Sequence, residues 1–288
     1  MKKKLFVLSD DPMGFSLIEL LTVMAIITLL LGLLVPSFAA VRRFATDTSQ
    51  RAGLASIGAS LTAFRNDYGD YPPSAFRVPG GYCGAQKMTE ALLGRDLLGF
   101  HPKSLWKPED DVYDSTSSTN LAERKGQYIE GINAFMGQDL FTQPDSMPDA
   151  MWVQLAGSYF FCDVYKKVSV RLLDGQRVRA GTPILYYRAN ESSNTLSFKI
   201  APSDRIYSHA DNAAVVEAAD FSEDRLLGQH PLGRPEPDNE FEYFYNYIAD
   251  PRVKAAIYPY RPNSFLLVSA GFDGKYGTAD DVCNFGIR

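Results

Sequence analysis

The sequence is poor in cysteine, and this excludes several classes of protein. Its 288 residues include three cysteines, at positions 83, 162 and 283. Three are too few for a disulfide scaffold, and their spacing excludes a CxxC zinc or redox site. An odd count allows one bridge and one free thiol, or no bridge at all. We expect these cysteines to serve as small buried apolar side chains.

Catalytic motifs are absent as well. The sequence contains no GxSxG, P-loop, GxGxxG or HExxH pattern. Its three histidines, His101, His209 and His230, lie far apart, and none has a histidine or cysteine two to four residues further on. We therefore expect them in loops or at the surface rather than on a metal. The sequence predicts that the protein is not an enzyme.

Basic residues are fewer than acidic residues. The 29 lysines and arginines against 34 acidic residues give a formal net charge of −5, which argues against a nucleic-acid partner. Hydrophobic residues make up 45% of the chain and charged residues 22%, a composition that excludes collagen-like and wholly disordered proteins. The first 38 residues are neutral overall, so the rest of the chain carries the whole acidic excess.

One long apolar run is present, and it lies near the beginning of the sequence. No charged residue occurs from Leu20 to Val35, and the apolar stretch covers Phe15–Val35 with Glu19 as its one charge. At about 1.5 Å per residue, a helix of this length spans roughly 30 Å, which is the thickness of a bilayer core. The basic residues Lys2–Lys4 precede it, so the positive-inside rule predicts a single-pass protein with the remainder of the chain exported.

Two processing sites remain open from the residues alone. Ser37-Phe38-Ala39 fits the small-x-small pattern of a conventional secretory signal, which is cleaved after the apolar run. A cut before the run, at Gly14, would instead place Glu19 five residues into the new chain. A carboxylate within an apolar segment costs about 2.5–3.5 kcal/mol, so its presence favours a helix whose own terminal amine needs a partner.

The string Gly14-Phe15-Ser16-Leu17-Ile18-Glu19-Leu20-Leu21 resembles the class III signal of type IV pilins and type II secretion pseudopilins. The match covers the short basic leader, the glycine before Phe15, the glutamate at the fifth mature position and the apolar helix that contains Pro36. The resemblance implies that a prepilin peptidase cuts after Gly14 and N-methylates Phe15. It also implies that Glu19 pairs with the terminal amine of a neighbouring subunit, which makes both charges less costly to bury.

The helical pattern continues beyond the apolar run. Apolar residues recur at steps of three and four along one face, at Leu54, Ile57, Leu61, Phe64 and Tyr68. Gly69 and the Pro72-Pro73 pair end this pattern. We expect one helix over about 15–68, with a membrane half and an amphipathic half that packs on a sheet and leaves Ser60 on the opposite face.

Other elements are expected to be short. Asp174-Gly175 predicts a hairpin between its flanking strands, and the polar residues 190–194 predict a second one. The strands predicted from alternating or apolar runs are 158–162, 168–172, 176–178, 184–188, 196–200 and 264–269. Further helices are predicted at 87–98 and, with an aromatic side, at 241–247, and residues 107–120 are predicted to form an exposed loop.

The C-terminal loop combines acids with glycines. Asp273, Asp280 and Asp281 lie within nine residues, and calcium takes six to eight oxygens from carboxylates and backbone carbonyls. The loop resembles the calcium loop of the major type II secretion pseudopilin, although Phe272 and Val282 replace its usual residues. The resemblance implies that the three aspartates bind calcium. From the residues alone, the alternative to a calcium site stays open, namely an Asp-Gly turn whose acidic side chains are solvated.

The resemblance implies an α+β, pilin-like fold in which the long N-terminal helix packs on an antiparallel β-sheet. Residues 1–14 would be a leader, 15–38 a transmembrane and assembly segment, and 39–288 an exported head. The segment at about 70–260 makes this head larger than a major pseudopilin requires, and its role is not evident from the sequence.

The resemblance further implies a structural subunit of a type II secretion pseudopilus, which polymerises through its N-terminal helix to drive protein export across the outer membrane. Its partners would be prepilin peptidase, copies of itself, minor pseudopilins and an inner-membrane assembly platform. It would be held in a bacterial inner membrane with a periplasmic head, and then in a periplasmic or extracellular filament. The alternatives are a type IV pilus or minor pilin-like subunit whose head binds a partner or surface, and an anchored or secreted binding domain, for example for carbohydrate.

Overall fold

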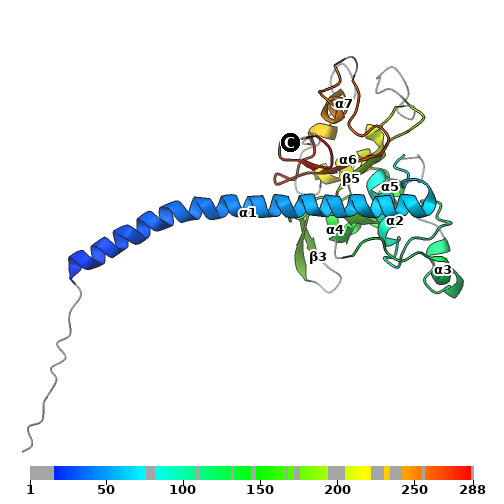
Figure 1. Cartoon of the computed structure of the whole chain (residues 1–288). Helices are drawn as coiled ribbons and strands as arrows, with labels where there is room; N and C mark the ends of the chain where they lie inside the picture. Colours follow the sequence, from blue (N-terminus) through cyan, green and yellow to red (C-terminus); the bar gives the residue numbers. More distant parts are fainter. Residues whose placement is uncertain are drawn as a thin grey trace, which may run out of the picture. The chain divides into compact units, whose positions relative to one another are not determined.

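The longest element is α1 (Leu17–Tyr68), a helix of 52 residues (Figure 1). Gly69 follows it with a left-handed backbone (φ +83°), and the Gly69 N–H donates to the Arg65 carbonyl at 2.7 Å. Glycine adopts this conformation without a Cβ clash, so the helix ends where the pattern predicts. The predicted helix over 15–68 is confirmed from residue 17 onward, while Phe15 lies outside the described residues.

The structure is a computed structural model, and it divides the chain into two units, Met1–Ala45 and Thr46–Arg288. We call the second unit the head. The described residues are 16–75, 82–107, 111–130, 133–143, 147–166, 168–171, 176–193, 205–221, 230–233, 242–254 and 257–286. Within them the architecture is α+β, with helices and three small antiparallel sheets.

The remaining elements are short and lie in the head. The helices are α2 (Gly84–Leu93), α3 (Ser118–Glu123), α4 (Gly137–Leu140), α5 (Asp149–Ala156), α6 (Ala213–Phe221) and α7 (Glu242–Ile248), with 3₁₀ turns at Asp111–Tyr113, His209–Asn212 and Pro231–Gly233. The strands are β1 (Ala134–Met136), β2 (Tyr159–Phe161), β3 (Val168–Arg171), β4 (Arg177–Ala180), β5 (Leu185–Arg188), β6 (Phe265–Ser269) and β7 (Val282–Cys283).

The central sheet has the order β5–β6–β7 and is antiparallel. Tyr186 stands opposite Leu267 in its register, and because side chains alternate along a strand, both face the same side. That side packs against the apolar stripe of α1, so the amphipathic half of the helix lies on an antiparallel sheet as predicted. The buried residues of this stripe are Leu54, Ile57, Leu61 and Phe64.

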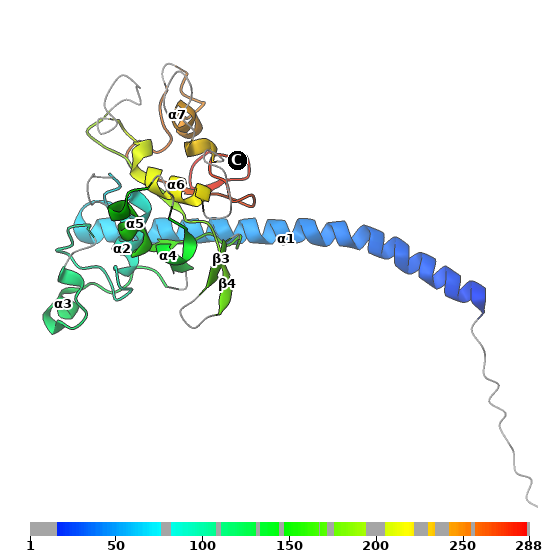
Figure 2. The ribbon, with the colours of Figure 1, turned by 180° about the vertical axis from the view of Figure 1, so that it is seen from behind.

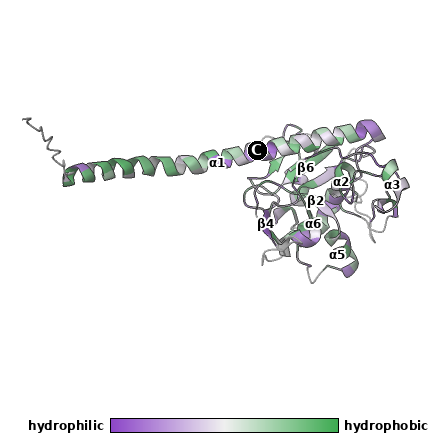
Figure 3. Ribbon diagram, turned by 90° about the horizontal axis from the view of Figure 1, so that it is seen from below, coloured by the Kyte–Doolittle hydropathy of each residue, from purple (hydrophilic) through white to green (hydrophobic). Residues whose placement is uncertain are grey.

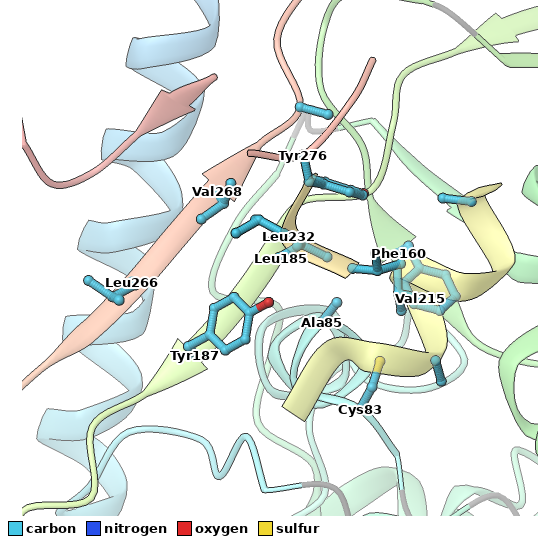
Figure 4. Packing of buried hydrophobic residues seen from close by; sticks show 14 of the residues in the cluster. Cys83, Ala85, Phe160, Leu185, Tyr187, Val215, Leu232, Leu266, Val268 and Tyr276 are labelled. Atoms are coloured by element: carbon cyan, nitrogen blue, oxygen red, sulfur yellow. The ribbon is translucent and has the colours of Figure 1, made fainter. Parts of the chain in front are cut away.

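The other side of the sheet packs against α6 and α7. Leu185, Tyr187, Leu266 and Val268 point into this second cluster, and Figure 4 shows them with Val215 of α6. All four strand residues are at most 2% exposed. Both faces of the sheet are buried, which explains why residues 185–187 and 265–268 are all apolar or aromatic rather than alternating with polar residues.

Several predicted elements are confirmed with shifted ends. The hairpin β3–β4 forms a separate sheet (Figure 2), although its Asp174-Gly175 turn lies outside the described residues. The aromatic helix at 241–247 is α7, and the helix expected at 87–98 is α2, which ends five residues earlier, where Gly94 follows with φ +83°.

The second predicted hairpin stays a prediction, because residues 196–200 lie outside the described residues. Its first strand, β5, pairs with β6, about 80 residues further along the chain. The strand at 158–162 forms as β2 but pairs with β1, which the sequence did not predict because β1 is only three residues long. The expected loop at 107–120 contains the 3₁₀ turn at Asp111–Tyr113 and the start of α3.

The segment after α1 covers Ser60, which was expected to be exposed on the face of this helix opposite the apolar stripe. Ser60 is 7% exposed and donates to the Tyr128 carbonyl at 3.0 Å, so its predicted exposure is wrong. Phe100 and Tyr128 lie edge-on to Phe64 with ring centroids 5.1 and 5.7 Å away, and the Tyr128 hydroxyl donates to Asp67 at 2.6 Å. This segment therefore encloses the C-terminal end of α1, a structural role that the sequence did not reveal.

The expected membrane span is not borne out. Among the described residues, no helix is both long enough and apolar enough to cross a bilayer. A span needs about 20 consecutive apolar residues. This finding overturns the expected single-pass location in an inner membrane with a periplasmic head.

We predict that Leu61→Ala lowers the free energy of unfolding by about 2–5 kcal/mol, because it leaves a cavity between α1 and the sheet. Leu61 is 0% exposed. Urea unfolding of the full chain followed by circular dichroism measures this loss. The control is Thr62→Ala at the next, exposed position, which should change stability by less than about 0.5 kcal/mol. Equal stability of the two variants would contradict the packing described for α1.

Candidate functional site

The start of α1 is capped by its own side chains. The Glu19 carboxylate accepts from the Ser16 backbone N–H at 2.9 Å, and the Ser16 hydroxyl accepts from the Glu19 backbone N–H at 3.3 Å. This reciprocal pair is a capping box, which satisfies two backbone donors that the first turn would otherwise leave open. Glu19 therefore has a local structural role as well as its predicted role in assembly. Gly14 and Phe15 lie outside the described residues.

The first half of α1 exposes large apolar side chains on every side of the helix. Of the 24 large apolar side chains recorded as exposed in the described chain, 16 fall within residues 17–44 and eight in all the rest. No charged residue occurs between Glu19 and Arg42. The ribbon is correspondingly green over this part of α1 in Figure 3. The 16 residues are Leu17, Ile18, Leu20, Leu21, Val23, Met24, Ile26, Ile27, Leu29, Leu30, Leu31, Leu34, Val35, Phe38, Val41 and Phe44.

Two threonines in this segment have hydroxyls that are already satisfied. Thr22 donates to the Glu19 carbonyl at 2.9 Å, and Thr28 donates to the Met24 carbonyl at 2.7 Å. Because the bonds lie within the helix, burying this surface against another apolar surface leaves neither hydroxyl without an acceptor. The uncharged residues 20–41 can therefore be enclosed by other helices at little polar cost. We call residues 17–44, which hold the 16 exposed apolar side chains, the apolar segment of α1.

In the C-terminal loop, Asp273 and Asp280 lie next to each other. The Asp273 N–H donates to Asp280 Oδ2 at 2.8 Å, and Asp273 Oδ1 accepts from the Lys275 N–H at 2.7 Å. Thr278 donates to Asp280 Oδ1 at 2.5 Å. Burial raises the pKa of Asp273, and the nearby negative charge of Asp280 contributes. The described hydrogen bonds leave lone pairs on both carboxylates, so these two side chains fit a cation.

Asp281 is placed differently from the other two aspartates. It is 3% exposed, and its Oδ2 accepts from the Tyr247 hydroxyl of α7 and from the Gly277 N–H at 2.8 Å. Its Oδ1 accepts from the Thr278 N–H at 3.3 Å. These three donors reach both oxygens of a buried carboxylate, so the structure does not present Asp281 to an ion in this conformation. It holds the loop to α7 instead.

The environment of Asp281 opposes its ionisation on balance. Burial raises its pKa to about 6, while the hydrogen bonds from Tyr247, Gly277 and Thr278 act in the opposite direction. Burial also raises the pKa of Tyr247 strongly, so this phenol stays protonated and donates. Sequence reasoning missed this pair because the two residues are 34 positions apart.

Of the three expected calcium ligands, the structure brings Asp273 and Asp280 together and places Asp281 against Tyr247. Among the residues that the structure describes, no three histidine, cysteine, aspartate or glutamate side chains come together as a metal-holding group. Calcium binding stays a prediction that depends on Asp273, Asp280 and backbone carbonyls.

The histidines and cysteines form no site together. His101 and His230 lie in loops, as one of the two expected placements has it, but they are buried, at 1% and 0% exposed. Each has an Nδ1 that accepts from a backbone N–H, that of Lys103 at 3.1 Å and that of Tyr276 at 3.0 Å. All three cysteines are free thiols; Cys83 is buried, and burial raises its pKa to about 12, so it behaves as an apolar side chain as expected.

Comparison of the chain with protein-family models, with curated proteins and with solved structures finds no match.

We predict that Tyr247→Phe lowers the free energy of unfolding by about 1–3 kcal/mol at pH 8, because a buried carboxylate loses a donor. The pKa of Asp281 should rise further above about 6, since the hydrogen bond from Tyr247 lowers it. The loss of stability should therefore be larger at pH 8, where the carboxylate is ionised, than at pH 4. Carboxyl NMR shifts measure the pKa, and urea titrations at the two pH values measure the stability.

Tyr243→Phe is the matched control for this experiment. Tyr243 also lies on α7 and also contacts the loop, where its hydroxyl donates to the Gly277 carbonyl at 2.5 Å, but it is 37% exposed. Its loss should cost less than about 1 kcal/mol and should not depend on pH between 4 and 8, because its acceptor does not titrate. An unchanged pKa of Asp281 in Tyr247→Phe would refute the described contact.

Proposed function

We propose that the chain is a structural subunit of a type II secretion pseudopilus, a filament that drives protein export across the outer membrane. In this role the chain polymerises through the apolar segment of α1. The observation that carries the proposal is the exposure of 16 large apolar side chains within 28 residues. A surface of this extent marks an interaction site, because water contact costs roughly 25 cal/mol per Å² of apolar area.

The distribution of these side chains favours an assembly of many copies over a dimer. A helix that pairs with one partner needs only a narrow apolar seam, whereas a helix that is apolar all round is enclosed on all sides. Several copies of α1 around one another would satisfy this requirement. Contacts between different faces of identical helices do not have to close into a ring and so can grow into a filament.

The head is compatible with a pilin-like fold. Its central feature is the packing of the stripe Leu54–Phe64 of α1 on the antiparallel sheet β5–β6–β7, which is the arrangement that the resemblance implies. The motif Gly14-Phe15 with Glu19 supports cleavage and N-methylation by a prepilin peptidase. Other pseudopilin subunits would be the partners in the filament. We assign a catalytic role to none of the described side chains.

A subunit of a type IV pilus, or a minor subunit with a binding head, is the second candidate. The observation in its favour is the segment between α1 and β2, which encloses the end of α1 and adds α2, α3, α4 and α5 to the head. This segment also exposes Leu98, Leu105 and Leu121, at 54%, 65% and 41%. A head enlarged in this way suits a subunit that meets a partner, for example at the tip of a filament.

The C-terminal loop supplies the calcium part of the proposal. Asp273 and Asp280 would hold the ion, which would supply positive charge between two adjacent carboxylates and so stabilise the loop. We predict that EGTA lowers the melting temperature of the full chain and that Asp273→Ala removes this response.

Asp114→Ala is the control for the calcium experiment. Asp114 forms the same kind of turn, with Oδ1 accepting from the Thr116 N–H at 2.8 Å, but it lies outside the C-terminal loop. This variant should keep the full response to EGTA. A wild-type melting temperature that does not change with EGTA or added calcium would reject the site.

Glu19 provides the test of the assembly mechanism, because its two roles can be separated. Glu19→Gln keeps an acceptor for the Ser16 N–H but removes the charge, whereas Ser16→Ala removes one capping bond and keeps the charge. If Glu19 neutralises the amine of a neighbouring subunit, Glu19→Gln should reduce filament formation at least tenfold. Ser16→Ala should assemble within about twofold of the wild type. Sedimentation and electron microscopy of filaments from cells with the assembly machinery measure both.

Mass spectrometry of the mature N-terminus completes this test. A mature chain that begins with N-methyl-Phe15 supports both proposed pilin-like functions, in the wild type and in every variant that is cleaved after Gly14. A chain that begins at Ala40 would instead identify a secreted binding domain and would refute the proposal. Normal filaments from Glu19→Gln would contradict the role given to the charge while leaving the apolar segment as the assembly surface.

A further inference from the structure

The two-stranded sheet of β3 and β4 carries a local excess of positive charge. Residues 166–179 hold five basic residues and one acidic residue, a net charge of +4. Because the whole chain has a formal net charge of −5, all its other residues together carry −9. We call β3 and β4 the basic ribbon. It is a positive patch on a chain that is otherwise acidic, so a second copy of the chain offers it the opposite charge.

The register of the basic ribbon sorts its residues onto two faces. Val170 stands opposite Val178, and Arg171 stands opposite Arg177. Opposite residues share a face and neighbours along a strand alternate, so Arg177 and Arg179 lie on the face away from Val178. Val170 is buried in the core of the head and Val178 packs against it, whereas Arg177 and Arg179 are exposed. Like charges at opposite positions weaken a strand pair, so Arg171 and Arg177 do not serve the stability of the ribbon.

The charge of the exposed face is not neutralised by contacts within the described head. Over the part of the chain that the structure describes, the ion pairs and hydrogen bonds include none made by the guanidinium of Arg177 or Arg179. Asp139 belongs to α4, which packs on the buried face, where Leu140 and Val170 are in one cluster. Both arginines are therefore available to carboxylates from outside the chain.

Three carboxylates lie near the start of the basic ribbon, namely those of Asp47, Asp163 and Asp280. Burial and these carboxylates raise the pKa of Tyr165, which precedes β3 by three residues. Asp163 is 0% exposed, and Asp47 accepts from the Tyr165 hydroxyl at 2.7 Å. Arg177 stands at the other end of the ribbon, about 10 Å further along. The three carboxylates therefore offset the positive charge least at Arg177.

The basic ribbon and α3 lie at opposite ends of the head along α1. The Val164 N–H, just before the ribbon, donates to Gln50 Oε1 at 3.0 Å, near the beginning of the part of α1 that belongs to the head. Phe100, in the segment that leads to α3, has its ring centroid 5.2 Å from that of Tyr68 at the end of α1. Gln50 and Tyr68 are 18 residues apart, which is about 27 Å of helix. Figures 1 and 2 show β3 and α3 near these two ends.

The segment before α3 carries the opposite charge. Residues 107–120, which we call the acidic segment, hold four acidic residues and one basic residue, a net charge of −3. Asp111 and Asp114 are its described acids, and both are exposed. Basic residues beside this segment already have acidic partners, in the pairs Lys103–Glu123 and Arg124–Asp96. The head is therefore basic at one end and acidic at the other.

We propose that the basic ribbon of one copy docks against the acidic segment of the next copy, at Asp111 and Asp114. This inference rests on the proposed function, because it requires a filament in which the α1 helices run in the same direction. Copies that follow one another along such a filament bring the Gln50 end of one head to the Tyr68 end of the next, so the opposite charges meet. The contact joins two different surfaces and can therefore repeat without closing. Complementary charge speeds the encounter and selects the register.

An exchange of charges tests this contact. The ribbon variant combines Arg177→Glu with Arg179→Glu, and the acidic-segment variant combines Asp111→Lys with Asp114→Lys. Each variant alone should reduce filament formation about tenfold or more, because like charges then face each other. The two variants combined in one chain should restore filaments to within about threefold of the wild type, because the contact re-forms with its signs exchanged. Sedimentation and electron microscopy of filaments from cells with the assembly machinery measure the yield.

Lys254→Glu is the matched control for Arg177→Glu alone, since each reverses one exposed charge and Lys254 lies beyond α7, outside the basic ribbon. It should assemble within about twofold of the wild type. Circular dichroism shows whether each variant keeps its fold, and Arg177→Gln with Arg179→Gln provides the test if the reversed ribbon does not fold.

The outcomes separate this inference from the function on which it rests. Wild-type filaments with an equal yield from the ribbon variant would overturn the docking and leave the proposed function standing; the arginines would then only protect an exposed strand edge. Folded variants that each fail to assemble and are not rescued in combination would also overturn it, because the ribbon would then meet another partner. A wild type that forms no filaments would overturn both.

Discussion

The structure depends on one helix that carries two different apolar surfaces. In the head, α1 presents a narrow stripe, Leu54–Phe64, and buries it against the sheet β5–β6–β7. In its first half, α1 exposes 16 large apolar side chains, which are distributed all round the helix. The stripe is buried within one chain, whereas the apolar segment is exposed in it. In the filament that we propose, this division would separate the folding of the chain from its assembly.

The head is secured at both ends of its chain by groups that are distant in sequence. The segment after α1 returns to enclose Phe64 with Phe100 and Tyr128. At the other end, Tyr247 of α7 donates to Asp281 just before β7, so the last strand cannot leave the sheet without exposing a buried carboxylate and breaking its hydrogen bonds. Both devices stabilise the sheet that holds α1, and neither depends on the apolar segment.

Local patterns in the sequence predicted the elements whose cause is local. The spacing of Leu54–Phe64 predicted the buried stripe, and Gly69 predicted the end of α1. The pairing of β5 with β6 could not be predicted from the sequence. About 80 residues separate the two strands, and the apolar pattern of each would allow it to pair with several other apolar runs. For the same reason Ser60 was expected to be exposed, and Asp281 was expected to face a cation rather than Tyr247. A carboxylate in an acidic loop has no local signature of burial.

The central claim is that the apolar segment of α1 is the surface through which copies of this chain meet. Electron cryomicroscopy of the assembled protein tests this claim most directly. The account predicts a filament whose interior is a bundle of α1 helices, with residues 17–44 of each copy enclosed by neighbouring copies and the heads outside. Filaments held together by contacts between heads, with residues 17–44 not enclosed by other copies, would contradict it.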